Sequence, residues 1–109
     1  MGIHFMVTKQ QLMEALARVE DPELGISIVD LGLIYGVEVK PKKAGELQKV
    51  LIRMTFTTPA CPLMNQMLEE TKRQLEGFKD ADIEITVTFD PLWSPDRMSE
   101  KAKIRLGMI

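Results

Sequence analysis

The sequence predicts a single two-layer α/β (α+β) domain in which helices cover mainly one face of a three-stranded mixed sheet. Apolar residues recur at helical spacing in two segments and alternate with polar residues in three others. These five segments and a final helical segment near the C-terminus follow one another as α-β-β-α-β-α. The strands are polar on their outward face, so helices are needed on the other face only.

The composition is that of one globular domain with a neutral surface. The chain has 109 residues, 45% of them hydrophobic, and a formal net charge of -2. A nucleic-acid-binding module would carry a basic face, and a membrane span would need about 20 consecutive apolar residues; neither partner is expected. Residues 1–5 are interpreted as a leader or vector-derived extension and residues 6–109 as the domain. Cys61 is the single cysteine, which excludes an intrachain disulfide and favours a reducing, cytoplasmic compartment.

The first predicted element is a helix with a capping box. Thr8 is the expected N-cap and Gln11 follows three residues later. Pro22 disfavours a helical conformation at Asp21, so the helix is expected to end near Glu20. The apolar residues that follow one another at helical spacing are Leu12, Ala15, Leu16 and Val19.

Three strands follow, separated by a short turn and a second helix. The first is expected to place Tyr35, Val37 and Val39 on one face, and the polar turn at 41–46 makes it antiparallel to the second. A helix from Pro62 to Phe78 should connect the second and third strands in parallel. The inward-facing residues of these two strands are Val50, Ile52, Met54 and Phe56, then Ile83, Ile85, Val87 and Phe89. A final helical segment is expected to open at Ser94, with a second start at Ser99.

This topology brings three loops to one edge of the sheet. They are residues 21–30, 57–63 and 90–96, which precede the first strand or follow the second and third. In open α/β sheets, ligands bind outside the carboxyl ends of strands. We therefore expect the functional site at this edge.

Cys61 is the residue in these loops with the most distinctive chemistry. It is expected at or next to the N-cap of the second helix, with Pro62 at the first helical position. Unpaired amides and the helix dipole there would lower the thiol pKa and raise its affinity for soft metals, whereas nearby carboxylates would raise that pKa. A buried, purely structural cysteine is the alternative interpretation.

Several chemistries lack the residues they need. His4, in the leader, is the only histidine, so neither a Cys-His pair nor a Ser-His-Asp arrangement has a base within the domain. One cysteine cannot complete the thiolate shell of an iron-sulfur cluster or a structural zinc site. Any metal or cluster would need ligands from a second subunit, a client protein, a small thiol or carboxylates.

The three loops resemble those of the metal-sulfur cluster biosynthesis family, which includes the SufT-like and PaaD-like iron-sulfur assembly proteins. The matching segments are Asp-Pro-Glu-Leu-Gly at 21–25, Ile-Val-Asp-Leu-Gly-Leu-Ile-Tyr at 28–35, Thr-Thr-Pro-Ala-Cys-Pro-Leu at 57–63, Asp-Pro-Leu-Trp-Ser-Pro at 90–95 and Arg-Met-Ser at 97–99. With the elements between them they span almost the whole domain.

The resemblance implies an accessory, non-enzymatic role in maturing iron-sulfur clusters or delivering them to client apoproteins, or in equipping a multicomponent oxygenase. Iron or a cluster would be bound transiently, with Cys61 as the reactive residue and metal ligand. Assembly proteins and clients are the implied partners, and a homodimer would supply a second thiol. The supporting loop residues are Thr57, Thr58, Pro59 and Pro62. The acidic candidates are Asp21, Glu23, Asp30 and Asp90. Trp93 is a candidate anchor for the partner.

Two other functions fit the same residues. A small thiol-dependent enzyme, such as a peroxidase or a persulfide-transferring protein, would use Cys61 as its nucleophile, although it would lack a base and a resolving cysteine. A protein-interaction adaptor would keep Cys61 as a structural residue.

Overall fold

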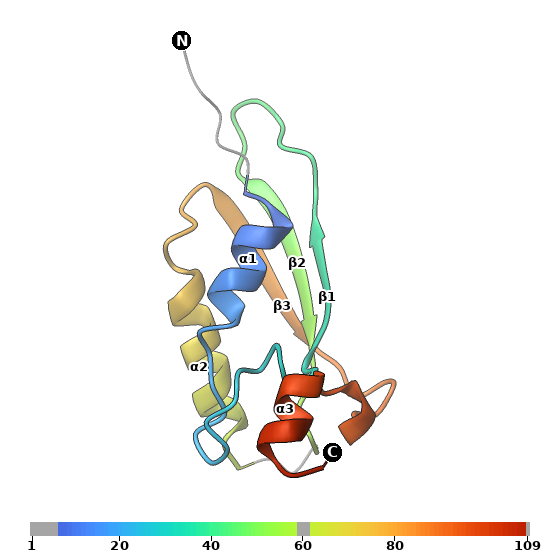
Figure 1. Ribbon diagram of the computed structural model, residues 1–109. Coiled ribbons are helices and arrows are strands. Elements are labelled where there is room, and N and C mark those ends of the chain that lie inside the picture. The colour runs from blue at the N-terminus through green and yellow to red at the C-terminus, as the bar shows by residue number, and fades with distance from the viewer. Residues whose placement is uncertain (1–6, 59–61, 109) are drawn as a thin grey trace.

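The computed structural model describes residues 7–58 and 62–108, and within them the elements follow the predicted order. Figure 1 shows their arrangement. The elements are α1 (Lys9–Leu16), β1 (Ile34–Val39), β2 (Gln48–Met54), α2 (Met64–Leu75), β3 (Ala81–Val87), the short 3-10 helix η1 (Pro95–Arg97) and α3 (Glu100–Arg105).

The sheet has the predicted mixed topology, with β2 in the centre. β1 pairs with β2 antiparallel and β3 pairs with β2 in parallel. Along β2 the residues alternate between a buried face and an exposed or half-buried face, because α1 and α2 cover one side only (Figure 1). The predicted two-layer α/β fold is therefore confirmed. The buried residues of β2 are Gln48, Val50, Ile52 and Met54.

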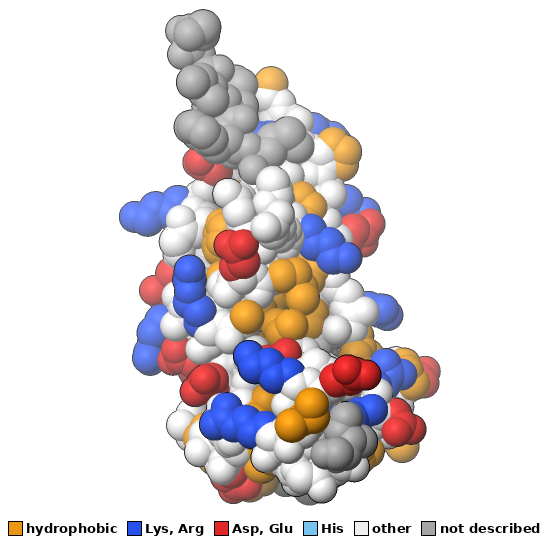
Figure 2. Space-filling model, in the orientation of Figure 1, with side chains coloured by type: hydrophobic (Ala, Val, Ile, Leu, Met, Phe, Trp, Pro, Cys, Tyr) orange, Lys and Arg blue, Asp and Glu red, His pale blue; other side chains and the backbone are white. Residues whose placement is uncertain are grey.

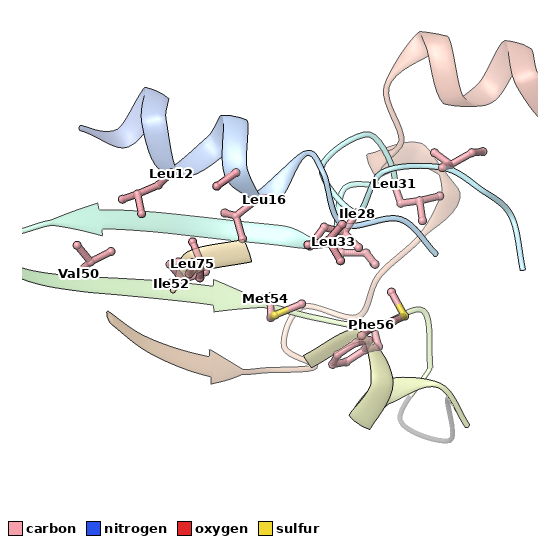
Figure 3. Packing of buried hydrophobic residues seen from close by; sticks show 14 of the residues in the cluster. Leu12, Leu16, Ile28, Leu31, Leu33, Val50, Ile52, Met54, Phe56 and Leu75 are labelled. Carbon is pink, nitrogen blue, oxygen red and sulfur yellow. The ribbon is translucent and has the colours of Figure 1, made fainter. Parts of the chain in front are cut away.

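The core contains an irregular segment as well as the helices and the sheet. Figure 3 shows α1 packing over β2 through Leu12 and Leu16, with Leu75 of α2 beside them. The connection between α1 and β1 adds a further group of fully or almost fully buried side chains, so this loop is part of the packed interior. Its core residues are Val19, Ile26, Ile28, Leu31 and Leu33.

The first helix is shorter than predicted, although its N-terminal cap agrees with the sequence. The Thr8 hydroxyl accepts the Gln11 N–H, and the Gln11 side chain accepts the Thr8 N–H, which completes the capping box. The helix ends at Leu16 instead of near Glu20. The N–H of Val19 donates to the carbonyl of Leu16, three residues earlier, which closes a tighter turn than that of an α-helix. This turn redirects the chain, and Val19 is buried in the core.

The second helix begins two residues later than predicted. Pro62 and Leu63 form a turn, and the first helical hydrogen bond runs from the Met67 N–H to the Leu63 carbonyl. Two expectations are therefore wrong: Pro62 does not occupy the first helical position, and Cys61 is not at or next to the N-cap, because the N-cap is Leu63. The helix runs from Met64 to Leu75, so it also ends before the predicted Phe78. At the C-terminus, the predicted second start is correct: the Ser99 hydroxyl accepts the Ala102 N–H and caps α3.

A bulge in β1 changes which residues face the helices. Ile34 pairs with Met54 and Gly36 pairs with Arg53, which leaves Tyr35 as an extra residue. Val37 then pairs with the buried Ile52, so Tyr35 does not share a face with Val37 as the alternation had predicted. The bulge frees the Tyr35 side chain to contact a loop.

The helix layer leaves part of β1 uncovered. Val37 and Val39 are only half-buried although they lie on the helix-covered face. Figure 2 shows hydrophobic side chains gathered between α1 and α3, while charged groups are scattered over the remaining visible surface. The β1 edge is therefore the more weakly covered part of this face.

Gly32 allows two backbone segments to approach each other closely. Its φ is +76°, in the left-handed region, and a Cβ there would overlap the Arg97 carbonyl oxygen and lie 2.7 Å from the carbonyl carbon. The neighbouring Ser99 N–H donates to the Asp30 carbonyl at 2.8 Å. The segment around η1 therefore packs directly against the loop before β1, with no side chain between them at this point.

We predict that Gly32→Ala destabilises the fold more than a matched change elsewhere. The variant combines left-handed strain with a backbone overlap, for an expected loss of about 2–3 kcal/mol in the free energy of unfolding. Gly45→Ala is the control, because Gly45 has a φ of +77° and nothing within 4 Å of its Cβ position; we expect a loss of about 1 kcal/mol there. Urea unfolding of both variants measures the difference, and equal losses would contradict the close approach.

Candidate functional site

The described parts of the three predicted loops lie at one end of the sheet, as expected (Figure 1). This end holds the start of β1 and the carboxyl ends of β2 and β3. The Thr55 N–H donates to the Leu33 carbonyl at 2.8 Å, and the Thr88 N–H donates to the Met54 carbonyl at 2.9 Å. These bonds fix the chain where it enters or leaves each strand.

Loop 90–96 is held against the start of β1 by two long-range side-chain hydrogen bonds. The Tyr35 hydroxyl donates to the Pro91 carbonyl at 2.8 Å, and the Trp93 indole N–H donates to the Leu31 carbonyl at 2.7 Å. The Arg97 guanidinium lies 4.5 Å from the centroid of the Tyr35 ring, within the range of a cation–π contact. The loop is therefore fixed from both sides.

Trp93, which from the sequence could be either a core residue or an exposed anchor, has a structural role within the chain. Its ring is half-buried and packs against the core, while its only polar atom donates inward. An indole placed in this way orders the loop, and its predicted role as a partner anchor stays a prediction. Tyr35 and Arg97 were not predicted as site residues, because their contact depends on the bulge in β1 and on the fold of η1.

Asp21 and Glu23 belong to a tight turn in the first loop. One carboxylate oxygen of Asp21 accepts the N–H groups of Glu23 and Leu24 at 2.8 and 3.1 Å, as in an Asx turn. The Glu23 side chain is exposed. Asp21 therefore stabilises local backbone, and it also lines a cavity of about 670 Å³ between this loop and α2. The charged residues of that cavity are Arg18, Glu20, Asp21, Glu69, Glu70 and Arg73.

Asp30 and Asp90 lie on different segments of this end. Asp30 is half-buried and lines a cavity of about 220 Å³ that also includes Lys101 and Arg105 of α3. Asp90 is exposed, and its backbone N–H donates to the Thr88 hydroxyl at 3.2 Å. Within residues 7–58 and 62–108, no three histidine, cysteine, aspartate or glutamate side chains are grouped so that they could hold a metal ion. The predicted ligand role of the acidic residues therefore stays a prediction.

The cysteine loop is described only at its two ends. Pro59 and Cys61 lie outside the described residues, so the position of the thiol stays a prediction. Thr57 and Thr58 before them, and Pro62 after them, are exposed at this end of the domain, while Phe56 is buried. The loop thus leaves the core at Phe56 and its described ends lie on the surface.

The described chain contains no helix that is long and apolar enough to cross a lipid bilayer.

Comparisons with protein families, with known proteins and with solved structures each find a match over most of the chain. A family model described as iron-sulfur cluster assembly protein matches residues 9–95. An Fe-S protein maturation auxiliary factor from Porphyromonas gingivalis is 36% identical over 100% of both chains. The auxiliary factor YitW from Bacillus subtilis is 40% identical, over 92% of this chain and 94% of that one. The solved structure of a conserved hypothetical protein from Thermotoga maritima is 34% identical, with a TM-score of 0.78 over 96% and 99% of the two chains. The chain belongs to the iron-sulfur cluster assembly protein family.

Proposed function

We propose that this protein is an accessory factor that helps to mature iron-sulfur proteins by binding iron or a cluster transiently and passing it to a client apoprotein. The observation that supports it most directly is the match to the family along nearly the full chain, including the loop with Cys61. The relatives from Porphyromonas gingivalis and Bacillus subtilis are named Fe-S protein maturation auxiliary factors. We infer that the present chain acts in the same class of process, in the cytoplasm.

In this proposal Cys61 is the ligand for the cargo. A thiolate is the side chain that iron-sulfur clusters prefer, and this chain has one cysteine. The exposed positions of Thr58 and Pro62 support a thiol that partners can reach. Thr57, Thr58, Pro59 and Pro62 would set the course of the loop around it.

The shortage of ligands explains why the binding would be transient. A cluster held by one thiolate keeps coordination sites for other ligands, so it can pass to a client that offers several cysteines. The missing ligands would come from a small thiol, from the client or from the second thiol of a homodimer. Asp21 already accepts two backbone N–H groups, so Asp30 and Asp90 are the better candidates for an additional oxygen ligand or for orienting the client.

We predict that Cys61→Ala and Cys61→Ser abolish maturation and leave the fold intact. The test is complementation of a Bacillus subtilis strain that lacks YitW, with the activity and iron content of a purified iron-sulfur enzyme as the measurement. Removing the thiolate removes the cargo ligand, whereas the exposed ends of the loop predict little change in stability. Thr86→Ala, at an exposed threonine of β3 that has no part in the proposed site, is the control. Full client activity with either cysteine variant would refute the proposal.

We also predict that the thiol reacts once and does not turn over. The domain lacks a histidine base and a resolving cysteine, which a peroxidase or a persulfide transferase would use. Purified protein treated with hydrogen peroxide or a persulfide donor alone should therefore be modified at Cys61, and adding a thiol reductant should regenerate the thiol without sustained, catalysed consumption of the peroxide or donor. Sustained turnover that disappears in Cys61→Ser would instead identify an enzyme.

A further inference from the structure

Large apolar side chains are exposed mainly at the end of the domain that carries the candidate site. Leu24 and Leu92 lie in two of the three loops, and Ile104 and Met108 lie in or just after α3. Among the described residues, Leu47 is the one large exposed hydrophobic outside this end. Single exposed apolar residues are common on protein surfaces, so the way in which each of these side chains is held has to be considered as well.

Leu92 is the most exposed of them, at 69%, and the residues on both sides of it are fixed by long-range hydrogen bonds. The residue before it accepts a hydrogen bond from Tyr35, and the residue after it donates one to Leu31. The Trp93 ring is packed against the core. Two contacts with distant parts of the chain therefore fix the backbone on both sides of a side chain that remains largely in solvent.

Such an arrangement is suited to binding. A protein that docks on an ordered loop loses less conformational entropy than one that must order the loop first. An apolar side chain gains most when it enters a pocket that removes it from water. Because Leu92 is already presented on an ordered backbone, its burial by a partner would contribute almost fully to affinity.

The surrounding charges indicate what kind of pocket fits. Asp90 and Asp96, on either side of Leu92 in the sequence, are both exposed. Arg97, which follows Asp96, is exposed as well, but its guanidinium lies 4.5 Å from the centroid of the Tyr35 ring. A pocket with basic side chains at its rim would complement these carboxylates. A symmetric contact between two copies through Leu92 would bring the same carboxylates of both chains together, and Arg97 would have to leave the Tyr35 ring to offset their repulsion.

We propose that Leu92 is the docking residue for the client apoprotein, which receives it in an apolar pocket rimmed by basic side chains. The inference rests on the proposed function, since it assumes that a client approaches this end to accept the cargo. Asp90 and Asp96 orient the client through the basic rim. Tyr35 and Trp93 act as positioning residues that hold the loop in its docking conformation.

The first test compares exposed leucines at the two ends of the domain. Leu92→Ser is expressed in the strain that lacks YitW, at a level at which the amount of this protein limits maturation. We expect it to slow maturation of the iron-sulfur enzyme about fivefold or more. Leu92→Met should restore maturation, because it retains an apolar side chain of similar volume. Leu47→Ser is the matched control, since Leu47 is 55% exposed and lies in the turn at the opposite end of the sheet. We expect no effect there.

The thermal unfolding midpoint of each variant separates lost docking from lost folding. Unchanged maturation with a folded Leu92→Ser chain would overturn the docking inference alone, provided that Cys61→Ala still abolishes maturation. If Cys61→Ala also leaves maturation intact, the proposed function itself fails. If Leu92→Ser and Leu47→Ser slow maturation equally, the inference is also overturned, because the effect would then not depend on the end of the domain that carries the candidate site.

The second test identifies the occupant directly. A photoreactive benzoylphenylalanine is placed at position 92 of the full chain in the same strain, and at position 47 as the control. After irradiation, we expect a covalent adduct with an iron-sulfur apoprotein from position 92, lost when the client is already loaded, and no such adduct from position 47. An adduct only with a second copy of the chain, or none with an iron-sulfur protein, would overturn the proposal.

Discussion

The arrangement of this domain depends on the docking of residues 90–99 against the loop that precedes β1. Gly32 and the backbone of Arg97 meet without an intervening side chain, and Ser99 donates to the Asp30 carbonyl beside them. Together with the hydrogen bonds that Tyr35 and Trp93 donate, this contact fixes the path of the segment after β3 across the end of the sheet. The contact joins the C-terminal helix to a loop that is itself part of the hydrophobic core.

A consequence is that much of the polar chemistry at this end has a structural use. The carboxylate of Asp21 is occupied by backbone N–H groups, and the polar atoms of Tyr35 and Trp93 are occupied by carbonyls of facing loops. The bonds of Tyr35 and Trp93 order the backbone from which Leu92 extends to the surface. A rigid frame that presents a few reactive or apolar residues suits a protein whose partners supply the remaining ligands.

Local patterns in the sequence predicted the elements well, because their causes are local. The capping box at Thr8 and the alternation along 50–54 each depend on neighbouring residues, and both are confirmed. The alternation does not continue to Thr55, which is buried although it was predicted to face outward. The end of α1 was wrong because a tight turn moves Val19 into the core. The prediction that Tyr35 shares a face with Val37 was wrong because of the β-bulge, and the residue types along the strand do not reveal a bulge.

The site was predictable as a place but not as a set of contacts. Topology alone brings the three loops to one edge, and the described residues confirm it. The bonds from Tyr35 to Pro91 and from Trp93 to Leu31 join residues 56 and 62 positions apart, and no periodicity specifies such pairs. The candidate carboxylates were chosen by residue type, whereas their contacts depend on turn geometry that only the fold establishes.

The central claim is that this chain binds iron-containing cargo through Cys61. Anaerobic reconstitution with iron, sulfide and a small thiol, followed by mass measurement of the intact complex under native conditions, tests it most directly. The account predicts added iron, alone or with sulfide, on the wild-type chain and none on a chain without the cysteine thiol. Equal iron on both chains, or none on the wild type, would contradict it.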